Sequence, residues 1–324
     1  MKIITFIIAI FTLIGTFLPY WDNDHWLVRG QENFKFVYLI LNLLLIAIIG
    51  VYFLDGFGTA LFTMLIFGFF FCFKSVFPYT RLANIEVEKT PDDRPEDEIK
   101  LLIYNVYQYN EDYQNLIDLV NERNPDIILL LETGIEWDES SKVLEDKYPY
   151  ILKEIREDTY GIKFLSRIEI LEGGVEHIVT EEVPSIEALF DINGKSLRIL
   201  GLHPKPPVPG EKLYSTTKDK EIMRAGKYFN TLPNEYQVLI GDLNDVAWSR
   251  ITYAFKNKTG MVDPRIGRGT FSTFPTYFPI RFPLDHIFIS NHFKLKEMKV
   301  ERNIGSDHYP VFVHLQLQEE LGEA

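Results

Sequence analysis

Hydrophobic residues are concentrated in three runs near the start of the chain. Residues 1–18 contain one charged side chain, Lys2, and residues 36–54 and 57–73 contain none. Each run has about the 17–25 residues that a helix needs to cross a bilayer. A core helix of that length would carry a polar stripe, and only Asn42 and a few threonines interrupt these runs. We therefore predict three transmembrane helices.

An alternative is that the first run is a cleaved signal peptide. No small-x-small cleavage site follows it, and two further hydrophobic runs do, so the pattern favours an anchor. The single cysteine, Cys72, lies inside the third run. It excludes a disulfide within the chain and a cysteine metal site, and we interpret it as a packing residue.

After Phe73 the pattern changes to short apolar runs that alternate with amphipathic stretches. The apolar runs predict strands at residues 99–106, 126–132, 160–167, 186–192, 196–203, 237–242, 284–290 and 308–317. The amphipathic stretches predict helices at 111–123 and near 136–146, 215–230 and 246–256. Many strands with few helices between them favour two packed sheets flanked by helices over one parallel sheet.

Residues 86–98 separate these two parts with two prolines, many acids and no apolar periodicity. Such a composition predicts a solvated linker. We therefore divide the chain into a membrane anchor (1–75), an acidic linker (76–98) and a folded domain (99–320).

The net charge of the domain disfavours one class of binding partner. The chain has 33 basic and 46 acidic residues, and residues 1–73 hold only three and four of them, which leaves about −12 on residues 74–324. Duplex DNA is bound mainly by cations that meet its phosphates. Nucleic acid is therefore disfavoured as the natural substrate.

Polar side chains stand where the predicted strands end or begin. They are Asn105, Glu132, His203, Asp242 with Asn244, Asp285 with His286, and Ser306 with Asp307 and His308. Each has an ordinary explanation, such as a solvated carboxylate, an Asx turn or a satisfied interior histidine. Six strand ends of this kind are hard to explain independently. Carboxylates, amides and imidazoles without cysteine suit a hard cation such as Mg²⁺ or Mn²⁺.

In this order, N…E…H…GDxN…DH…SDH, the residues resemble the endonuclease/exonuclease/phosphatase superfamily, the DNase I-like metal-dependent phosphoesterases. The resemblance extends over about residues 99–317, and its most specific pieces are IGDLND-x-x-WS, LDHIFIS and SDHYPVFV. The anchor, linker and domain together resemble the membrane-anchored bacterial branch. The resemblance implies an α/β fold, a four-layer α/β/β/α sandwich, preceded by three transmembrane helices.

The resemblance also implies a metal site. Glu132 would be the main carboxylate ligand of Mg²⁺ or Mn²⁺, with Asn105 and Asp307 close to the same ion. Abasic-site nucleases of the superfamily carry a second acid after the asparagine, where this chain has Val106 and Tyr107. That departure argues against the abasic-site subgroup and leaves Glu132 with fewer neighbouring acids at the metal.

The catalytic roles follow from the same resemblance. Asp242 would position or deprotonate the attacking water, while Asn244 and His203 would hydrogen-bond the phosphate oxygens. Asp285 would pair with His308 and fix its tautomer. Either Asp242 or His308 would take the proton. His286 is expected to face away from the site, and Trp248 to be a packing residue.

The implied function is hydrolysis of a phosphodiester, phosphomonoester or pyrophosphate bond. A domain tethered beside a bilayer meets lipid headgroups at high local concentration, which favours a lipid-linked substrate. The alternatives are a membrane-bound nuclease and a catalytically silent module that binds phospholipid or a partner protein. The aromatic and proline-rich residues 267–286 are either a lip that contacts substrate or headgroups, or a loop packed by its own side chains.

The expected location is the bacterial cell membrane. The count of Lys and Arg near the hydrophobic runs places the first loop and the large domain in the cytoplasm. The resemblance implies the reverse, with the N-terminus inside and the catalytic domain outside the membrane. The margin of the charge count is only a few residues, so we expect an extracytoplasmic domain.

Overall fold

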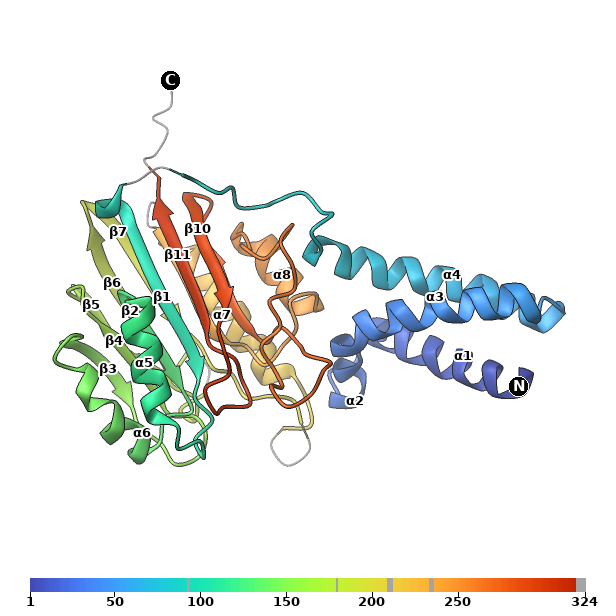
Figure 1. The fold of residues 1–324 in the computed structure, drawn as a ribbon, viewed down its shortest axis with the longest axis horizontal. Helices are drawn as coiled ribbons and strands as arrows, with labels where there is room; N and C mark the ends of the chain where they lie inside the picture. The colour runs from blue at the N-terminus through green and yellow to red at the C-terminus, as the bar shows by residue number, and fades with distance from the viewer. Residues whose placement is uncertain (92–93, 179, 209–211, 233–235, 319–324) are drawn as a thin grey trace, which may run out of the picture.

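The computed structural model describes residues 1–91, 94–178, 180–208, 212–232 and 236–318. Two β-sheets pack face to face between two layers of helices, and three long helices project from one side of this domain (Figure 1). The predicted four-layer α/β/β/α sandwich, preceded by three long apolar helices, is confirmed.

The first sheet has six strands. In spatial order they are β10 (Phe293–Val300), β11 (Val311–Leu317), β1 (Glu98–Asn105), β2 (Ile127–Leu131), β4 (Ile162–Ser166) and β3 (Tyr150–Glu154). Only β1 and β2 are parallel, so both end at the same edge of the sheet. Strand β11 is antiparallel to β1 and therefore begins at that edge.

The second sheet repeats this arrangement with five strands. In spatial order they are β5 (Glu172–Glu176), β6 (Ser185–Ile192), β7 (Lys195–Gly201), β8 (Tyr236–Asp242) and β9 (Asp285–Ile289). Here β7 and β8 are parallel, and β9 runs antiparallel to β8. The ends of β1, β2, β7 and β8 and the starts of β9 and β11 are thus the places where the polar residues stand.

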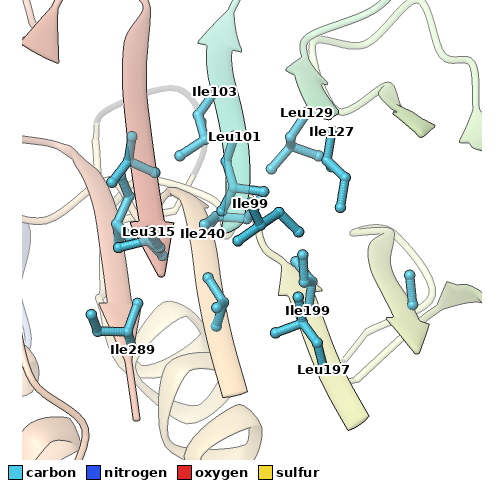
Figure 2. Packing of buried hydrophobic residues seen from close by; sticks show 14 of the residues in the cluster. Ile99, Leu101, Ile103, Ile127, Leu129, Leu197, Ile199, Ile240, Ile289 and Leu315 are labelled. Atoms are coloured by element: carbon cyan, nitrogen blue, oxygen red, sulfur yellow. The ribbon is translucent and has the colours of Figure 1, made fainter. Parts of the chain in front are cut away.

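Burial on both faces explains why the strand sequences are continuously apolar. Side chains alternate between the two faces of a strand. In β1, Leu101 and Ile103 enter the core between the sheets, while Leu102 and Tyr104 pack beneath the outer helices. Figure 2 shows the inter-sheet core, in which the first sheet faces Ile240 and Ile289 of the second.

Helices cover the outer face of each sheet. On the first sheet these are α5 (Tyr113–Arg123) and α6 (Ile135–Ser140), and on the second they are α7 (Thr216–Phe229) and α8 (Arg250–Thr259). The apolar stripe of α5 is buried as its periodicity predicts, through Leu116, Leu119 and Val120.

The N-terminal bundle consists of α1 (Lys2–Phe17), α3 (Lys35–Tyr52) and α4 (Gly56–Val76). With their adjoining turns these helices are 19, 27 and 24 residues long, with mean hydropathies of 2.2, 2.4 and 2.0, so each is long and apolar enough to cross a membrane. Inside the bundle, Asn42 Nδ2 donates to Thr16 Oγ1 at 3.1 Å. Such interhelical hydrogen bonds hold helices together where the surroundings are apolar.

The segment expected to be a solvated linker packs against the domain instead. Val87 is buried in the inter-sheet core. The carbonyl of Glu88 accepts the backbone N–H of Leu295 at 2.9 Å, and Glu86 accepts Lys256 Nζ at 2.7 Å. Strand β10 is an edge strand with free backbone groups, and residues 86–90 use them.

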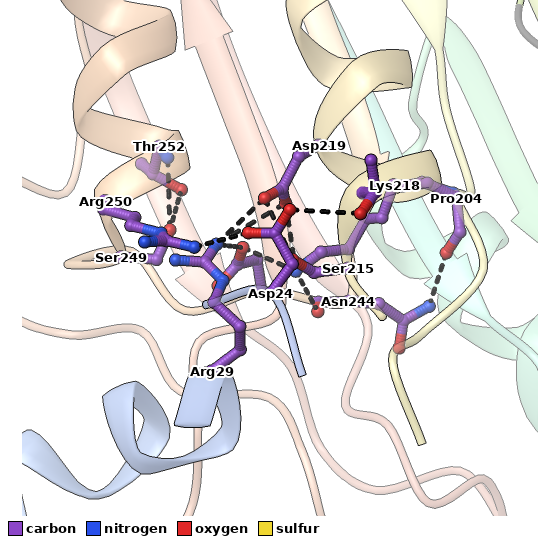
Figure 3. Close-up of polar contacts among 12 residues, drawn as sticks. Asp24, Arg29, Pro204, Ser215, Lys218, Asp219, Asn244, Ser249, Arg250 and Thr252 are labelled. Carbon is purple, nitrogen blue, oxygen red and sulfur yellow. Dashed lines mark hydrogen bonds and ion pairs between the residues drawn. The ribbon is translucent and has the colours of Figure 1, made fainter. Parts of the chain in front are cut away.

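The connection between α1 and α3 also docks on the domain, through α2 (Trp26–Arg29) and the residues around it (Figure 3). Asp24 accepts Arg250 Nη2 at 2.6 Å, and Arg29 Nη2 lies 3.4 Å from Asp219. Trp248 is buried at this junction and donates from Nε1 to the carbonyl of Glu32 at 2.8 Å, in agreement with its predicted packing role. The anchor is therefore a packed part of the fold.

Candidate active site

The strand ends bring the predicted site residues together at one edge of the sandwich. Asn105 ends β1, Glu132 follows β2, Asp242 ends β8 and Asp285 begins β9. The remaining members come from loops beside these strands, and they are His203, Asn244, Asp307 and His308.

An unusual backbone conformation helps to position two of these side chains, Glu132 and Asp242. Glu132 has φ 61°, a left-handed conformation that a non-glycine residue adopts at a cost. Gly241 has φ 138°, and a Cβ there would lie 2.0 Å from the carbonyl oxygen of Leu202. Only glycine fits at position 241, because the backbone of β8 lies too close to the backbone at Leu202 to leave room for a side chain. Asp242 leaves the strand directly after this contact.

A buried acid–imidazole chain crosses the site. Asp285 Oδ2 accepts His308 Nδ1 at 2.9 Å, and His308 Nε2 lies 3.5 Å from Asp242 Oδ2. Burial disfavours the imidazolium, but the charges of Asp285 and Asp242 outweigh it and raise the pKa of His308 to about 10. The ring is therefore a cation held between two carboxylates. The same cation outweighs burial at Asp285 and holds its pKa below the ordinary value.

Asn105 joins the carboxylates of Glu132 and Asp242, for which burial outweighs the charge of His308. Its Nδ2 donates to Glu132 Oε1 at 2.9 Å and to Asp242 Oδ2 at 3.2 Å. Desolvation raises the pKa of Glu132 to about 7 and that of Asp242 to about 6. The charge of Asp307 adds to the raised pKa of Glu132. Three acids in this small space fit a divalent cation, which would relieve their repulsion.

A second group of possible ligands overlaps with the first. One ligand atom each of Asp242, Asp285 and His308 lies within 4.8 Å of the others. Both ring nitrogens of His308 already face carboxylates, so the imidazolium balances this group. The chemistry of the donors therefore favours the Glu132 side for a cation. Asn105 turns its amide nitrogen toward Glu132, because its Oδ1 accepts the N–H of Tyr107 at 3.1 Å. In this orientation it donates to the carboxylate and offers no oxygen to a cation.

His203 and Asn244 complete the surroundings of Asp242. His203 Nε2 lies 3.9 Å from Asp242 Oδ2, and burial lowers the pKa of His203 to about 4. It is therefore a neutral ring that can donate one hydrogen bond. The Asn244 N–H donates to Asp242 Oδ1 at 2.8 Å, and its Nδ2 donates to the carbonyl of Pro204 at 3.0 Å.

Two supporting residues received no role from the sequence. Ser306 Oγ donates to the carbonyl of Asn105 at 2.8 Å and accepts the N–H of His308 at 2.9 Å, so it ties β1 to the histidine. Asp245 accepts Lys218 Nζ at 2.6 Å. Both belong to the motifs SDH and GDLND, but their partners are distant in the sequence and only the fold reveals them.

His286 faces away from the site, as predicted. It follows Asp285 in β9, and successive side chains of a strand point to opposite faces. Its Nε2 lies 2.8 Å from the carbonyl oxygen of Asp245, and its Nδ1 lies 2.9 Å from Arg265 Nη2. His286 therefore contacts the backbone of the loop that follows Asp242, on the side away from the site.

Comparisons with known proteins identify the family and the fold of the chain. Residues 102–308 match the model of the Endonuclease/Exonuclease/phosphatase family. No curated protein sequence matches the chain. Among solved structures, TDP2 of D. rerio in complex with a single-strand DNA product is similar, with a TM-score of 0.56, 15% identity, and 68% of this chain and 99% of that chain covered.

Two further structures have the same fold. An endonuclease/exonuclease/phosphatase family protein of Bacteroides thetaiotaomicron has a TM-score of 0.54 and 19% identity, with 68% of this chain and 98% of that chain covered. Sphingomyelinase C of Streptomyces griseocarneus has a TM-score of 0.50 and 15% identity, with 67% and 99% covered. At these identities the likeness establishes the fold alone.

Proposed function

The chain belongs to the endonuclease/exonuclease/phosphatase family, and from this premise we propose that it is a membrane-anchored, divalent-metal-dependent hydrolase of phosphate esters. The observation that carries the proposal is the buried chain Asp285–His308–Asp242 beside Glu132 at one edge of the sandwich. Family membership supplies the class of reaction, and these side chains supply its acid, base and ligand groups.

In this proposal Glu132 and Asp307 hold the metal ion, with Asn105 beside them. A bound Mg²⁺ or Mn²⁺ would polarise a phosphoryl oxygen and stabilise the charge that develops on it. The raised pKa of Glu132 supports this assignment, because a carboxylate that is costly to ionise alone gains most from a cation.

Asp242 is the general base. Its pKa of about 6 lies close to neutral pH, where a base is most effective. His308 is the weaker candidate because two carboxylates keep it protonated. It instead donates from Nε2 to a phosphate oxygen, while Asp285 fixes the orientation of the ring. His203 and Asn244 also lie beside Asp242 and donate to the remaining oxygens.

The substrate is a phosphodiester, phosphomonoester or pyrophosphate, and we propose that it is part of a lipid. Three apolar helices packed against the domain would keep the site beside a membrane. The similar structures include a sphingomyelinase, which by name acts on a lipid, and TDP2 with a DNA product. The charge of about −12 on residues 74–324 disfavours the nuclease alternative.

The location follows from the same helices. Three crossings place the N-terminus on one side of the membrane, and the α1–α3 connection and the domain together on the other. The contacts between that connection and the domain agree with this arrangement. We propose the bacterial cell membrane, with the domain outside.

The test is hydrolysis by the full-length protein in Mg²⁺ and in EDTA. The substrates are bis-p-nitrophenyl phosphate, p-nitrophenyl phosphate, single-stranded DNA and a polyprenyl pyrophosphate. We expect metal-dependent turnover that falls about 10²–10⁴-fold in Asp242→Asn and His308→Gln. Glu169→Gln, an exposed acid outside the site, is the control. Failure of every substrate with folded protein would favour the silent binding module, and equal rates in EDTA would exclude the metal.

A further inference from the structure

A groove of about 820 Å³ lies between the base of α3 and the segment 270–282. The α3 wall is formed by Phe36, Ile40 and Leu41, and the facing wall by Phe271, Ile280 and Phe282. The rings of Phe34 and Phe282 meet edge to face at 5.4 Å and join the two walls. One wall therefore belongs to a helix that would cross the membrane, and the other to the domain.

The domain wall is fixed directly to the catalytic segment. The N–H of Thr276 donates to the carbonyl of Asp307 at 2.9 Å, and the N–H of Tyr309 donates to the carbonyl of Thr273 at 3.0 Å. The ring of Phe274 lies 4.8 Å from the ring of His308. The aromatic segment thus reaches from the catalytic histidine to the base of α3.

Arg281 contributes a cation to the wall of the groove. The guanidinium of Arg281 lies 4.7 Å from the ring of Tyr309, the residue after His308. Both residues line the groove. Among the residues that the structure describes, no carboxylate forms an ion pair with Arg281. An exposed guanidinium of this kind is suited to a phosphate group, which it can bind with two hydrogen bonds.

The tip of the segment is apolar and exposed. Tyr277, Phe278 and Ile280 expose 77%, 51% and 42% of their surface. Leaving apolar surface in water costs about 25 cal/mol for each Å². Beside a membrane helix, these side chains and the groove would instead meet lipid.

We propose that the groove binds the hydrocarbon chain of a membrane lipid phosphate, and that Arg281 receives its phosphate on the way to Asp242 and His308. The inference rests on the proposed function and names the class of its substrate. The occupant is a lipid chain because one wall of this apolar groove is the first turns of a helix that is long and apolar enough to cross a membrane. Arg281 in the groove wall carries the opposite charge to a phosphate, while Glu301, which also lines the groove, is paired with Arg123.

The test compares two chromogenic substrates that differ only in chain length. Hexadecyl p-nitrophenyl phosphate and methyl p-nitrophenyl phosphate release the same leaving group, and both are offered to the full-length protein in phosphatidylcholine nanodiscs. Ile40→Trp fills the groove, whereas Leu43→Trp places the same ring on an exposed position of α3 outside it. Leu43→Trp meets the same local concentration of the hexadecyl ester in the bilayer as Ile40→Trp does. A loss that is confined to Ile40→Trp therefore cannot come from a difference in that concentration.

We expect Ile40→Trp to lower kcat/KM for the hexadecyl ester at least tenfold and to leave the methyl ester unchanged, with Leu43→Trp like the wild type. If Ile40→Trp loses both activities, Ile280→Asp at the exposed tip gives the same comparison without altering a membrane helix. An unchanged ratio of the two activities in both groove variants would overturn the lipid groove and leave the proposed function standing. A wild-type protein that hydrolyses neither ester would overturn both.

Discussion

At Asp242, three donors share one carboxylate. The Asn244 N–H and the Asn105 amide donate to it at 2.8 and 3.2 Å, and His308 Nε2 lies at 3.5 Å. Burial nevertheless raises its pKa to about 6, so the carboxylate can exchange a proton near neutral pH. Asp242 and Asp285 are partners on neighbouring strands, but their surroundings shift their pKa values in opposite directions. The pKa of Asp285 is lowered because this carboxylate makes the closer contact with His308.

Replacing Asp285 should alter the pH dependence of the reaction. Asp285→Asn removes the closest of the three anions that raise the pKa of His308, which are Asp285, Asp242 and Asp307, so the ring will lose its proton at a lower pH. We expect kcat to fall about 10²–10⁴-fold and the alkaline limb of the pH–rate profile to move to lower pH. Asp191→Asn, at an exposed position near the end of β6, serves as the control. An alkaline limb that stays in place would show that Asp285 does not tune His308.

A second residue-scale prediction concerns stability. Glu221 in α7 is buried, neither of its carboxylate oxygens has a hydrogen-bond partner in the described structure, and burial raises its pKa to about 8. The folded protein therefore keeps a proton that the unfolded chain releases near pH 4.5. Stability should fall between these two pKa values as pH rises, by on the order of 1.4 kcal/mol per pH unit.

Thermal unfolding of Glu221→Gln in detergent checks this prediction. Because glutamine does not ionise, the variant should have a higher midpoint than the wild type at pH 7.5 and a flatter dependence on pH. The same slope in both proteins would mean that Glu221 does not titrate in this range.

At the scale of elements, the sequence identified what is buried on both faces. Strands such as β2 and β8 have continuous apolar runs and were predicted, as were the stripes of α5 and α7. The sequence pattern did not predict three strands, and all three lie at the edge of a sheet: β3, β5 and β10. An edge strand buries fewer side chains, as the half-exposed FKLKEMKV of β10 illustrates, so its apolar pattern is weak.

The same reasoning explains what was predictable in the site. The polar strand ends could be found because each adjoins an apolar run, and parallel strands bring their ends to one edge. The residues that join them could not be found, because Ser306 reaches back to Asn105 and Asp245 pairs with Lys218 and Arg29 across long stretches of sequence. The contact of residues 86–90 with β10 was not predicted either, because their acidic composition is typical of a solvated linker.

Gly241 is the element-scale position most sensitive to a side chain. Its φ of 138° and the carbonyl of Leu202 leave no room for a Cβ. We expect Gly241→Ala to lower the free energy of unfolding by at least about 2 kcal/mol. Gly174→Ala, where the added Cβ meets nothing within 4 Å, should change it by less than about 0.5 kcal/mol. Chemical denaturation of both variants gives the comparison, and equal stabilities would contradict the close approach.

At the scale of the whole molecule, the anchor and the domain share a buried ion network. Arg29 from the α1–α3 connection lies among Glu32, Asp219 and Asp245. Lys218 pairs with Asp245, and the buried Lys35 lies close enough to Glu32 to lower its pKa. Asp245 directly follows Asn244, so this network ties the N-terminal part of the chain to the loop after β8. Assays of the proposed function should therefore use the full chain.

Removing the cation of Arg29 should destabilise the protein strongly. Arg29→Met would remove the cation that contacts all three acids, the buried Glu32 and Asp245 and the partly buried Asp219, and leave only Lys218 and Lys35 near them. Breaking a buried network of this kind costs about 3–5 kcal/mol. We expect the midpoint of thermal unfolding in detergent to fall by about 5–15 °C. Arg302→Met, which breaks an exposed pair with Glu122, should cost less than about 1 kcal/mol. Similar midpoints for the two variants would mean that the docked anchor adds no stability.

The most direct measurement is the rate of bis-p-nitrophenyl phosphate hydrolysis by the full-length protein as Mg²⁺ is titrated, with the wild type beside Glu132→Gln. We expect saturable activation of the wild type, and in Glu132→Gln an activation that is lost or needs at least tenfold more metal. Glu136→Gln, an exposed acid on α6, should behave like the wild type. Identical activation curves for Glu132→Gln and the wild type, or full activity without metal, would contradict a metal-dependent phosphoesterase centred on these strand ends.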